Sequence, residues 1–388
     1  MHPQQMALRC VICRGGTSKG IFIHQNELPS DPSRRDRVIL AIYGSPDIRQ
    51  IDGLGGADPL TSKVAIIGPS TRADADVDYL FGQVNITKPF VDYRGNCGNI
   101  SAGVGPFAID EGLVQTREPI TKVRIHQVNT NRMIVAEVPT VGGKAAIVGD
   151  YEIAGVPGTG ARIKLDFADS AGSATGKLLP TGNIVDELDV DGVGKLEVSI
   201  VDAANPTVFC RMKDLGVKGT ETPREIDSNM ELSKRIEDIR ASSAELMGFV
   251  KHRSLAAAES PYIPFIALVR EPMAYIKYTD GKGVKAEDVD LTSRLCFMQQ
   301  VHKTYPVTGT ICTAVAAKIH GTIANEVLSE RGRKSGEMRI GHPAGIIAVE
   351  SDVQKTRDGF RVDRAAVGRT ARRIMEGYVY VPREVLED

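Results

Sequence analysis

Two stretches of small residues constrain the fold of this 388-residue chain more than any other feature. The first, residues 92–105, is a polar, glycine-rich turn that contains Cys97 and continues into glycine, serine and alanine. A helix with so little side-chain bulk can be enclosed on all sides by other backbone. We expect its first N–H groups, at Gly98 to Ser101, to be free and to lie at the positive end of the helix dipole, which stabilises an anion or a thiolate.

The second stretch, residues 305–319, has the same character. Its turn, Thr308-Gly309-Thr310, opens a helix of alanines and β-branched residues. The upstream segments also match, since residues 14–23 precede the first turn much as residues 202–210 precede the second. We therefore expect two similar domains, each contributing one helix start to a shared cleft.

The length of the chain is sufficient for two domains. Residues 151–185 are rich in Gly, Ser, Ala and Thr and have few periodic apolar positions, so we expect the chain to cross between the domains there. The predicted domains are residues 1–185 and residues 186–371. The final segment, residues 372–388, contains a Tyr-Val-Tyr-Val run typical of a strand and is expected to pack back on the first domain.

Charge and hydropathy exclude several classes of function. The chain has 48 Lys and Arg against 49 Asp and Glu, and this net charge of -1 lacks the basic excess of a nucleic-acid-binding protein. No apolar run approaches the ~18 residues of a membrane span, and the N-terminus lacks the apolar segment of a signal peptide. We expect a cytoplasmic homo-oligomer with no nucleic-acid or membrane partner.

Hydrophobic periodicity predicts that strands dominate the first half and enclose the small-residue helix. It also predicts three other helices. One covers residues 31–44 and has Asp31 and Ser33 as cap candidates. A second begins behind the cap candidates Asp227 and Ser228, and a third lies around residues 287–303.

Motifs for common cofactors are absent from the sequence. There is no Walker phosphate loop, and the run Gly53-Leu-Gly-Gly56 follows no clear strand–helix unit of a dinucleotide-binding site. The seven histidines show no metal-binding spacing, and no Gly-x-Ser-x-Gly hydrolase motif occurs. Cys10 and Cys13 form a lone Cys-x-x-Cys pair in an apolar, strand-like run, which favours a core position over a zinc or redox site. We therefore expect no metal and no organic cofactor.

Lys63 and Cys97 are the candidate acid–base residues. Each lies in a glycine-rich loop, and each side chain can exchange a proton near neutral pH in a suitable environment. Two such groups on either side of a small bound anion could remove a proton from one of its carbon atoms and return a proton to it. The helix starts would stabilise the negative charge that develops on a carboxylate. This arrangement suits a cofactor-free proton shift on a carboxylic acid. A buried turn cysteine and a surface lysine at a strand start are the alternative interpretations.

Several motifs resemble the diaminopimelate epimerase superfamily. Cys-Gly-Asn at residues 97–99 resembles its first catalytic turn, and Asn205-Pro206 resembles its Gly-Asn-Pro strand end. Residues 308–310 stand where those epimerases carry a second Cys-Gly-Thr/Ser, but threonine replaces the cysteine, so two-thiol racemisation is not expected. Cys312 lies more than a helical turn further along and is not expected to take over that role.

One branch of this superfamily, the PrpF-like isomerases, resembles the chain essentially from end to end. The resemblance implies an α+β fold of two pseudo-symmetric domains, each a curved, mostly antiparallel sheet wrapped around a central helix. It also implies that Lys63 and Cys97 are the acid–base residues. The matching motifs lie at residues 14–22, 55–63, 95–103, 341–345 and 368–377.

The branch includes isomerases of 3-methylitaconate and 2-methylaconitate and a tautomerase of 4-oxalomesaconate. The chain resembles the first of these activities most, which implies a 1,3-allylic proton shift from 3-methylitaconate to 2,3-dimethylmaleate, with the other two acids as alternatives. The resemblance further implies a small anionic carboxylate as the ligand. The expected substrate-binding residues are Thr17, Ser18, Asn96, Gly98, Asn99, Asn205, Thr308, Gly309, Thr310 and His342.

Two other functions stay open. An epimerase or racemase of an amino or hydroxy acid would introduce solvent deuterium at one stereocentre without moving a double bond. A non-catalytic carboxylate-binding protein would still bind its ligand after Lys63→Ala and Cys97→Ser substitution and would show no turnover. The presence of two titrating groups favours an enzyme over a binding protein.

Overall fold

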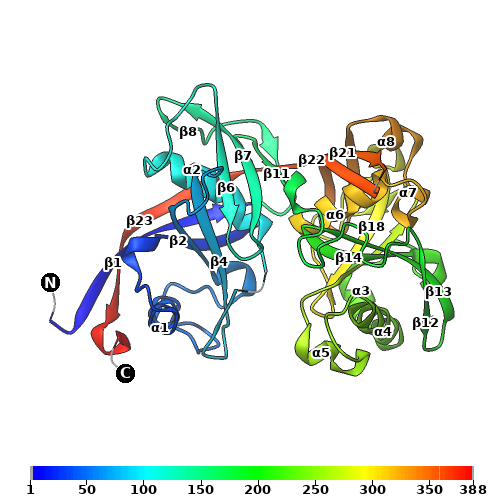
Figure 1. Cartoon of the computed structure of the whole chain (residues 1–388), viewed down its shortest axis with the longest axis horizontal. Coiled ribbons are helices and arrows are strands. Elements are labelled where there is room, and N and C mark those ends of the chain that lie inside the picture. Colours follow the sequence, from blue (N-terminus) through cyan, green and yellow to red (C-terminus); the bar gives the residue numbers. More distant parts are fainter. Residues whose placement is uncertain (1–2, 94, 358, 387–388) are drawn as a thin grey trace. The chain divides into compact units, whose positions relative to one another are not determined.

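The computed structural model describes residues 3–93, 95–357 and 359–386 and divides into two compact units (Figure 1). The first unit consists of Met1–Leu165 and Gly368–Asp388, and the second of Asp166–Val367. The chain therefore passes between the units twice. The first passage lies within strand β11 (Ile163–Asp166), and the second lies within strand β22 (Gly359–Arg369).

The first unit is built on a mostly antiparallel sheet. Its strands pair in the order β23, β1, β2, β3, β4, β6, β7, and only the pairs β2–β3 and β4–β6 are parallel. The C-terminal strand is thus hydrogen-bonded to the N-terminal one. The bounds are β1 (Gln5–Gly15), β2 (Ser18–His24), β3 (Lys63–Pro69), β4 (Val77–Val84), β6 (Ile120–Gln127), β7 (Arg132–Val141) and β23 (Ala371–Pro382).

The second unit repeats this topology. Its strands pair in the order β12, β13, β14, β15, β18, β20, β21, β22, with only β14–β15 and β18–β20 parallel. The same sequence of strand directions in both units confirms the predicted pseudo-symmetric halves. The bounds are β12 (Asp186–Val190), β13 (Gly194–Ala203), β14 (Asn205–Arg211), β15 (Phe265–Arg270), β18 (Leu291–Phe297), β20 (Glu337–His342) and β21 (Gly345–Thr356).

Each unit wraps its strands around one helix, as expected from the two small-residue stretches (Figure 1). These are α2 (Gly98–Asp110) and α6 (Val307–Lys318). Every residue of α6 except Lys318 is buried. In α2, a Cβ atom on Gly103 would lie only 2.6 Å from the Phe22 ring. The sheet can approach this closely because the helix has no side chain at that position.

Replacing Gly103 with valine should therefore reduce stability. A larger side chain must displace the buried Phe22 ring, and overpacking of this kind costs about 1–3 kcal/mol of unfolding free energy. Urea unfolding of Gly103→Val measures the loss. The matched control is Gly336→Val, because a Cβ on Gly336 meets no atom within 4 Å, and we expect it to stay within ~0.5 kcal/mol of the wild type. Equal stabilities of the two variants would contradict this account of the helix.

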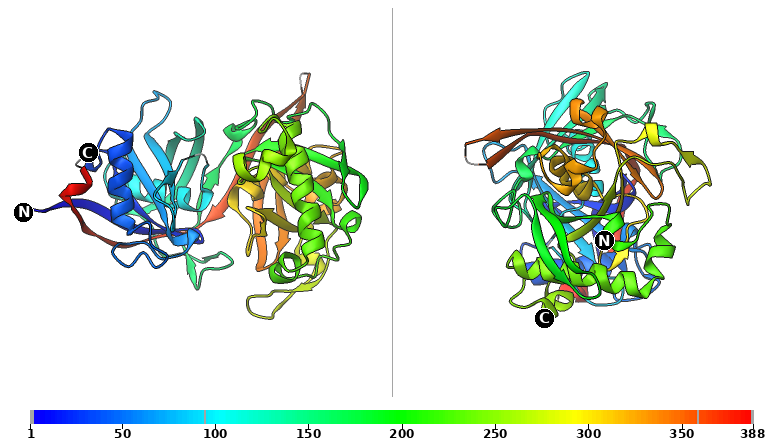
Figure 2. Two further views of the ribbon diagram at one scale, coloured as in Figure 1. Left: turned by 90° about the horizontal axis from the view of Figure 1, so that it is seen from below. Right: turned by 90° about the vertical axis from the view of Figure 1, so that its right-hand side faces the viewer.

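Two further helices cover the outer faces of the sheets (Figure 2). Helix α1 (Pro32–Tyr43) is capped by Asp31, which accepts a hydrogen bond from the backbone N–H of Arg34 at 2.9 Å, as predicted. Helix α4 (Met230–Leu246) is capped by Asn229, so the prediction of Asp227 or Ser228 as its cap was wrong. Because serine, aspartate and asparagine all make good caps, residue type alone does not select among neighbours.

The helix predicted around residues 287–303 is wrong. This segment forms β18 and the short strand β19 (Gln300–Val301), joined by a turn in which Met298 and Gln299 have positive φ angles of 47° and 57°. Strand β18 is buried along most of its length, including the polar residues Thr292, Ser293 and Arg294, so its apolar residues do not alternate as they do in a half-buried strand.

The unit boundaries differ from the predicted ones. Residues 166–185 group with the second unit, and residues 368–371 with the first. One reason is the buried carboxylate of Asp202 in β13, which accepts hydrogen bonds from the backbone N–H groups of Ala174 (2.9 Å) and Thr175 (2.7 Å). This glycine- and serine-rich segment is therefore held by the second unit and is no free linker.

Glu111, directly after α2, joins the helix to three strands. Its carboxylate accepts hydrogen bonds from Arg9 of β1 (2.5 Å), His24 of β2 (2.9 Å) and Arg373 of β23 (2.6 Å). Burial alone would raise the pKa of Glu111, but these hydrogen bonds lower it from 4.5 to about 2. A carboxylate with a lowered pKa stabilises the fold above its unfolded-state pKa and loses that effect as the pH falls.

We expect the stability of Glu111→Gln to differ from that of the wild type mainly above pH 4.5. The variant should be ~1–3 kcal/mol less stable at neutral pH, and the difference should shrink as the pH falls from 4.5 towards about 2. Urea unfolding over this pH range tests the expectation. The exposed ion pair of Asp74 with Arg72 supplies the control, since Asp74→Asn should change little. A constant difference across the range would contradict the role of Glu111.

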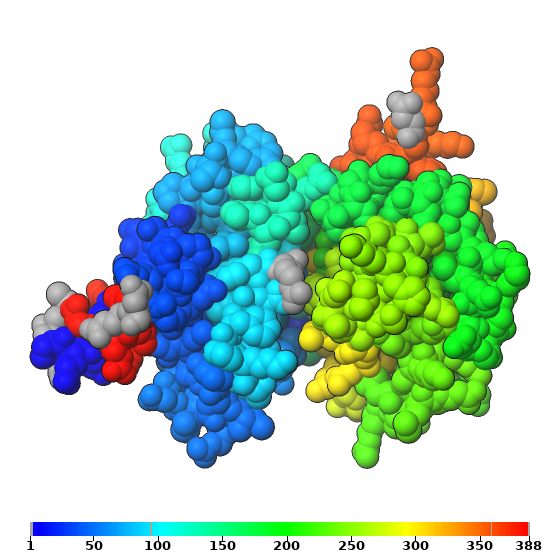
Figure 3. All heavy atoms as spheres, turned by 60° about the horizontal axis from the view of Figure 1, so that its bottom comes forward, coloured from blue at the N-terminus to red at the C-terminus, as the bar shows by residue number. Residues whose placement is uncertain are grey.

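The tip of the β21–β22 hairpin, around residues 354–357, is exposed, projects from the second unit (Figure 3) and carries no predicted site residue. None of the helices in the described part of the chain is long and apolar enough to cross a membrane. The short elements are β5 (Val91–Asp92), β8 (Lys144–Ala145), β9 (Tyr151–Glu152), β10 (Thr159–Gly160), β16 (Tyr275–Ile276), β17 (Gly283–Val284), α3 (Pro223–Asp227), α5 (Ala256–Glu259), α7 (Ile323–Glu326) and α8 (Glu330–Lys334).

Candidate active site

Lys63 is the first residue of β3, and its ammonium group is held by a neutral amide. Its Nζ atom donates a hydrogen bond to Oε1 of Gln83, the residue opposite it on β4, at 2.7 Å. Nε2 of Gln83 donates in turn to the carbonyl groups of Ser62 (2.9 Å) and Pro59 (3.1 Å), so its oxygen must face the lysine. The backbone carbonyl of Lys63 accepts a hydrogen bond from the buried hydroxyl of Tyr43. The lysine side chain is thereby fixed without a carboxylate partner among the residues that the structure describes.

Cys97 is the N-cap residue of α2, and its side chain makes no capping hydrogen bond. The thiol is half-buried, unlike those of the other five cysteines, which are buried. The N–H group of Ser101 donates to the carbonyl of Cys97 at 2.9 Å, and so does its hydroxyl at 3.0 Å. Free amides were predicted at residues 98–101, and the prediction was wrong for Ser101, whose amide is already hydrogen-bonded. The amides of Gly98, Asn99 and Ile100 are the ones that have no acceptor within the helix.

Tyr79 of β4 lies close to this turn, and residue patterns did not single it out. Its side chain is fully buried, and its hydroxyl has no hydrogen-bond partner among the described residues. Burial raises the pKa of Tyr79 well above its usual value, and the neighbouring sulfur of Cys97 adds to the rise. In the sequence this tyrosine is one of several alternating strand residues, so no local signal distinguishes it from the core.

The turn between β1 and β2 packs against the start of α2. Gly16 has a positive φ of 52°, and a Cβ atom on it would lie 2.2 Å from Oδ1 of Asn99. The N–H group of Thr17 donates to the same oxygen at 3.4 Å. Ser18 is 2% exposed, and its hydroxyl has no partner among the described residues. The structure thus brings together Thr17, Ser18 and Asn99, three of the predicted binding residues.

Asn96, also predicted, lies in the turn before α2 and is buried. Its Oδ1 atom accepts a hydrogen bond from the hydroxyl of Ser101 at 3.3 Å. Since the same hydroxyl donates to the carbonyl of Cys97, Asn96 helps to shape the turn that carries the thiol. This contact is a structural one, and substrate binding by Asn96 stays a prediction.

In the second unit, Asn205 and Thr308 meet at the start of α6. Nδ2 of Asn205 donates to Oγ1 of Thr308 at 3.1 Å. The helix is capped by Pro306, and the amides of Thr308 and Gly309 have no acceptor within it. The amide of Thr310 donates to the carbonyl of Pro306 at 2.8 Å, as does its hydroxyl at 3.0 Å. The amide and the hydroxyl of Thr310 are therefore not free to donate to a ligand, and substrate binding by Thr310 stays a prediction.

His342, the last predicted binding residue, ends β20 and is 2% exposed. Its Nδ1 atom accepts a hydrogen bond from the N–H group of Ala344 at 3.3 Å, and its carbonyl accepts one from the hydroxyl of Tyr275 at 2.9 Å. Its ring centroid lies 6.2 Å from that of Tyr305. These contacts give the ring a defined position within the second unit.

The other cysteines are core residues. Cys312 is fully buried and donates to the carbonyl of Val201 at 3.2 Å, and burial raises its pKa to about 12. It is therefore a poor substitute for a second catalytic thiol, as expected. Cys10 and Cys13 are three residues apart on β1, so they point to opposite faces, and burial raises the pKa of both. Within the described residues, no group of three or more His, Cys, Asp and Glu side chains is placed to hold a metal ion.

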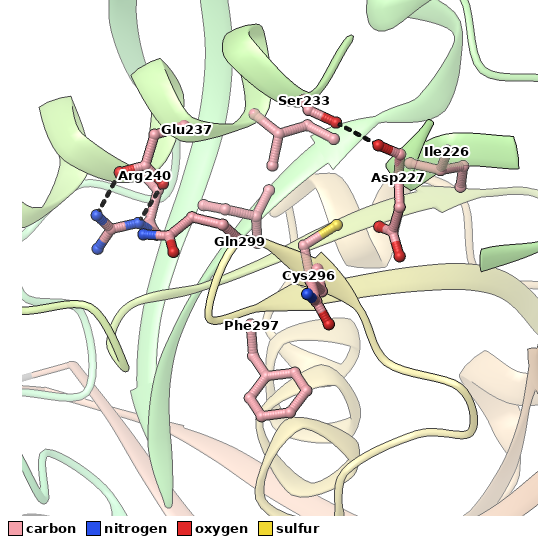
Figure 4. A pocket seen from close by; sticks show the side chains of 11 residues that line it. Ile226, Asp227, Ser233, Glu237, Arg240, Cys296, Phe297 and Gln299 are labelled. Carbon is pink, nitrogen blue, oxygen red and sulfur yellow. Dashed lines mark hydrogen bonds and ion pairs between the residues drawn. The ribbon is translucent and has the colours of Figure 1, made fainter. Parts of the chain in front are cut away.

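A small cavity lies beside Cys296 in the second unit (Figure 4). Asp227, Glu237, Arg240 and Phe297 are among its lining residues, and none of the predicted site residues borders it. Its volume of about 20 Å³ has room for a single water molecule but none for a dicarboxylate. It is a packing defect next to α4.

Comparisons with known proteins agree with the motifs. A family model described as PrpF protein matches residues 5–382. The 3-methylitaconate isomerase of Eubacterium barkeri is 56% identical over 382 residues, which cover 98% of this chain and 99% of that protein. A crystal structure of methylitaconate-delta-isomerase superposes with a TM-score of 0.90 at 55% identity, covering 99% of this chain and 98% of the other. A hydroxyproline epimerase from Agrobacterium vitis shares the fold alone, with a TM-score of 0.54 at 11% identity over 98% of this chain and 94% of the other. Because the match extends over nearly the whole sequence, the chain belongs to the PrpF family.

Proposed function

We propose that this protein is an isomerase that moves a carbon–carbon double bond in 3-methylitaconate by a 1,3-allylic proton shift, giving 2,3-dimethylmaleate. The observation that carries the proposal is the 56% identity to a 3-methylitaconate isomerase over almost the full length of both chains. The placement of Lys63 and Cys97 is consistent with it, since both belong to the first unit, with Lys63 at the start of β3 and Cys97 at the start of α2. The reaction needs only proton transfers, and we propose that it requires no cofactor.

In the proposed mechanism, Lys63 in its neutral form removes the proton from the carbon that bears the methyl group. The electrons of that C–H bond form a new double bond, and the electrons of the original double bond shift towards the terminal methylene carbon, while the carboxylate shares the negative charge. A proton is then delivered to that terminal carbon, which becomes a methyl group. Cys97 is the partner or alternative donor for this second step.

The negative charge of the dienolate intermediate needs stabilisation. The amides of Gly98 and Asn99 supply donors at the positive end of α2, and Thr17 and Ser18 lie next to them. Binding of the substrate by Asn96, Asn205, Thr308, Gly309, Thr310 and His342 stays a prediction based on the family resemblance. Action in the cytoplasm and assembly as a homo-oligomer are also proposals.

Proton NMR in deuterated buffer tests the proposed activity. With 3-methylitaconate, we expect the signals of the terminal methylene group to disappear and the signal of a new methyl group on the double bond, partly deuterated, to appear. Conversion of 2-methylaconitate or 4-oxalomesaconate in place of 3-methylitaconate would move the assignment to those acids. Deuterium entry at a single stereocentre without movement of the double bond would identify an epimerase and overturn the proposal.

A further inference from the structure

Arg369, the last residue of β22, is a buried cation without a buried anion. Its side chain is 5% exposed, and burial lowers its pKa to about 10. Its Nε atom donates to Oδ1 of Asn99 at 3.3 Å, and Nη1 donates to the carbonyl of Gly368 at 2.9 Å. No carboxylate in the described part of the chain forms an ion pair with it. A buried charge is normally paired, so an arginine in this position indicates a function that requires the charge.

The contact with Arg369 determines how the carboxamide of Asn99 is oriented. Oδ1 of Asn99 accepts hydrogen bonds from Arg369 and from the N–H group of Thr17. Guanidinium and backbone N–H groups can only donate, so the oxygen of the carboxamide must face both. The NH₂ group then points the other way. No described residue accepts a hydrogen bond from it, which leaves two N–H donors available at the second residue of α2.

A second side chain in the same place also lacks a partner. The hydroxyl of Ser18 is buried and makes no hydrogen bond among the described residues, although it follows the turn that packs on Asn99. The free amides of Gly98, Asn99 and Ile100 belong to the same helix start as the Asn99 carboxamide. Asn99 thus connects the buried charge of Arg369 with the β1–β2 turn and with unpaired donors, and a carboxylate would satisfy such donors.

We infer that Arg369 is a positioning residue of the proposed isomerase: it holds the carboxamide of Asn99 with its NH₂ group towards a carboxylate of the substrate and supplies the positive charge that this carboxylate balances. The inference rests on the proposed function for the identity of the ligand. Arg369 itself does not contact the substrate, since its guanidinium is on the far side of Asn99.

A purely structural role is the alternative, in which Arg369 only stabilises the fold. The two roles make different predictions for three variants. Arg369→Met should raise KM for 3-methylitaconate by about 10-fold or more and lower kcat by a smaller factor, because it removes the charge-assisted hydrogen bond that orients the Asn99 carboxamide. Arg369→Lys should fall between this variant and the wild type, since a single ammonium cannot reproduce the planar guanidinium contact.

Asn99→Asp separates stability from binding. The new carboxylate keeps an acceptor for Arg369 and converts the contact to an ion pair, so the melting temperature should equal or exceed that of the wild type. The NH₂ donor is lost and a negative charge faces the substrate, so KM should rise at least as much as in Arg369→Met. The matched control is Arg240→Met, because Arg240 is 2% exposed but paired with Glu237, and it belongs to the second unit. We expect this control to lose stability and to keep the wild-type KM.

The decisive measurement is KM, kcat and melting temperature for the wild type and these four variants. A lower melting temperature with an unchanged KM in Arg369→Met, or an unchanged KM in Asn99→Asp, would overturn the inference. Wild-type turnover reports separately on the proposed function. If the wild type converts none of the acids, maleate is added to the wild type and to Arg369→Met, and the melting temperature of each is measured. A rise in the wild type that is lost in Arg369→Met supports the inference. No rise in the wild type, or an equal rise in both proteins, overturns it.

Discussion

The Lys63→Met variant is expected to lose kcat by roughly three orders of magnitude, the middle of the range for removing a general base. Methionine has a similar length and apolar stem, so it should occupy the space of the lysine, which is 8% exposed. The variant lacks any group that can accept a proton at this position. Both isomerisation and exchange of the substrate's methine proton with deuterated buffer should therefore fall together, and NMR measures the two in one experiment.

Stability must be separated from chemistry in this variant. Methionine leaves Oε1 of Gln83 without its donor, which costs about 1 kcal/mol of unfolding free energy for a partly buried acceptor. Lys318→Met is the matched control, because Lys318 is also partly buried and donates to backbone carbonyls, at Gly332 (2.7 Å) and Ser335 (2.5 Å). It should lose comparable stability with kcat close to the wild type. Retention of more than about a tenth of the activity by Lys63→Met would place the base elsewhere.

Cys97→Ser is expected to lower kcat by about 10²- to 10³-fold, because a hydroxyl transfers a proton far less readily than a thiol near neutral pH. If Cys97 delivers the proton to the terminal carbon, the variant should still exchange the methine proton with solvent while it forms almost no 2,3-dimethylmaleate. The ratio of exchange to product formation should then rise sharply over that of the wild type.

The control for this variant is Cys13→Ala. Cys13 is buried in β1, and its truncation should reduce stability through lost packing while leaving kcat unchanged. A parallel loss of exchange and product formation in Cys97→Ser would instead assign the first proton transfer to the thiol. Full activity of both Cys97→Ser and Cys97→Ala would remove Cys97 from the mechanism.

The two small-residue stretches allowed the fold to be predicted, because few arrangements of helices and strands suit a helix with so little side-chain bulk. A helix made of glycine, serine and alanine can be surrounded by strands at close range, as the contact between Gly103 and Phe22 demonstrates. Their repetition predicted two similar units, and the identical order of strand directions confirmed it. The helix predicted around residues 287–303 was wrong for the complementary reason: a strand buried on both faces has no periodicity that identifies it.

The helix starts were predicted correctly, but the number of free amides was not. Ser101 and Thr310 each donate to a carbonyl four residues earlier, which removes them as donors to a ligand. That detail depends on where the first helical turn begins, and capping residues such as Cys97 and Pro306 do not mark the position by their type.

The amino-acid sequence was sufficient to select the family and the two enclosed helices, and it supplied Lys63 and Cys97 as candidate acid–base residues, because each has a local chemical signature. It did not reveal the neighbours that orient them. Gln83 faces Lys63 through the register of β3 and β4, and Arg369 reaches Asn99 across 270 residues of chain. Such contacts depend on strand pairing between distant segments, and the type of a residue does not predict which partner its side chain will contact. The folded structure was therefore needed to find the groups that hold the candidate site residues in place.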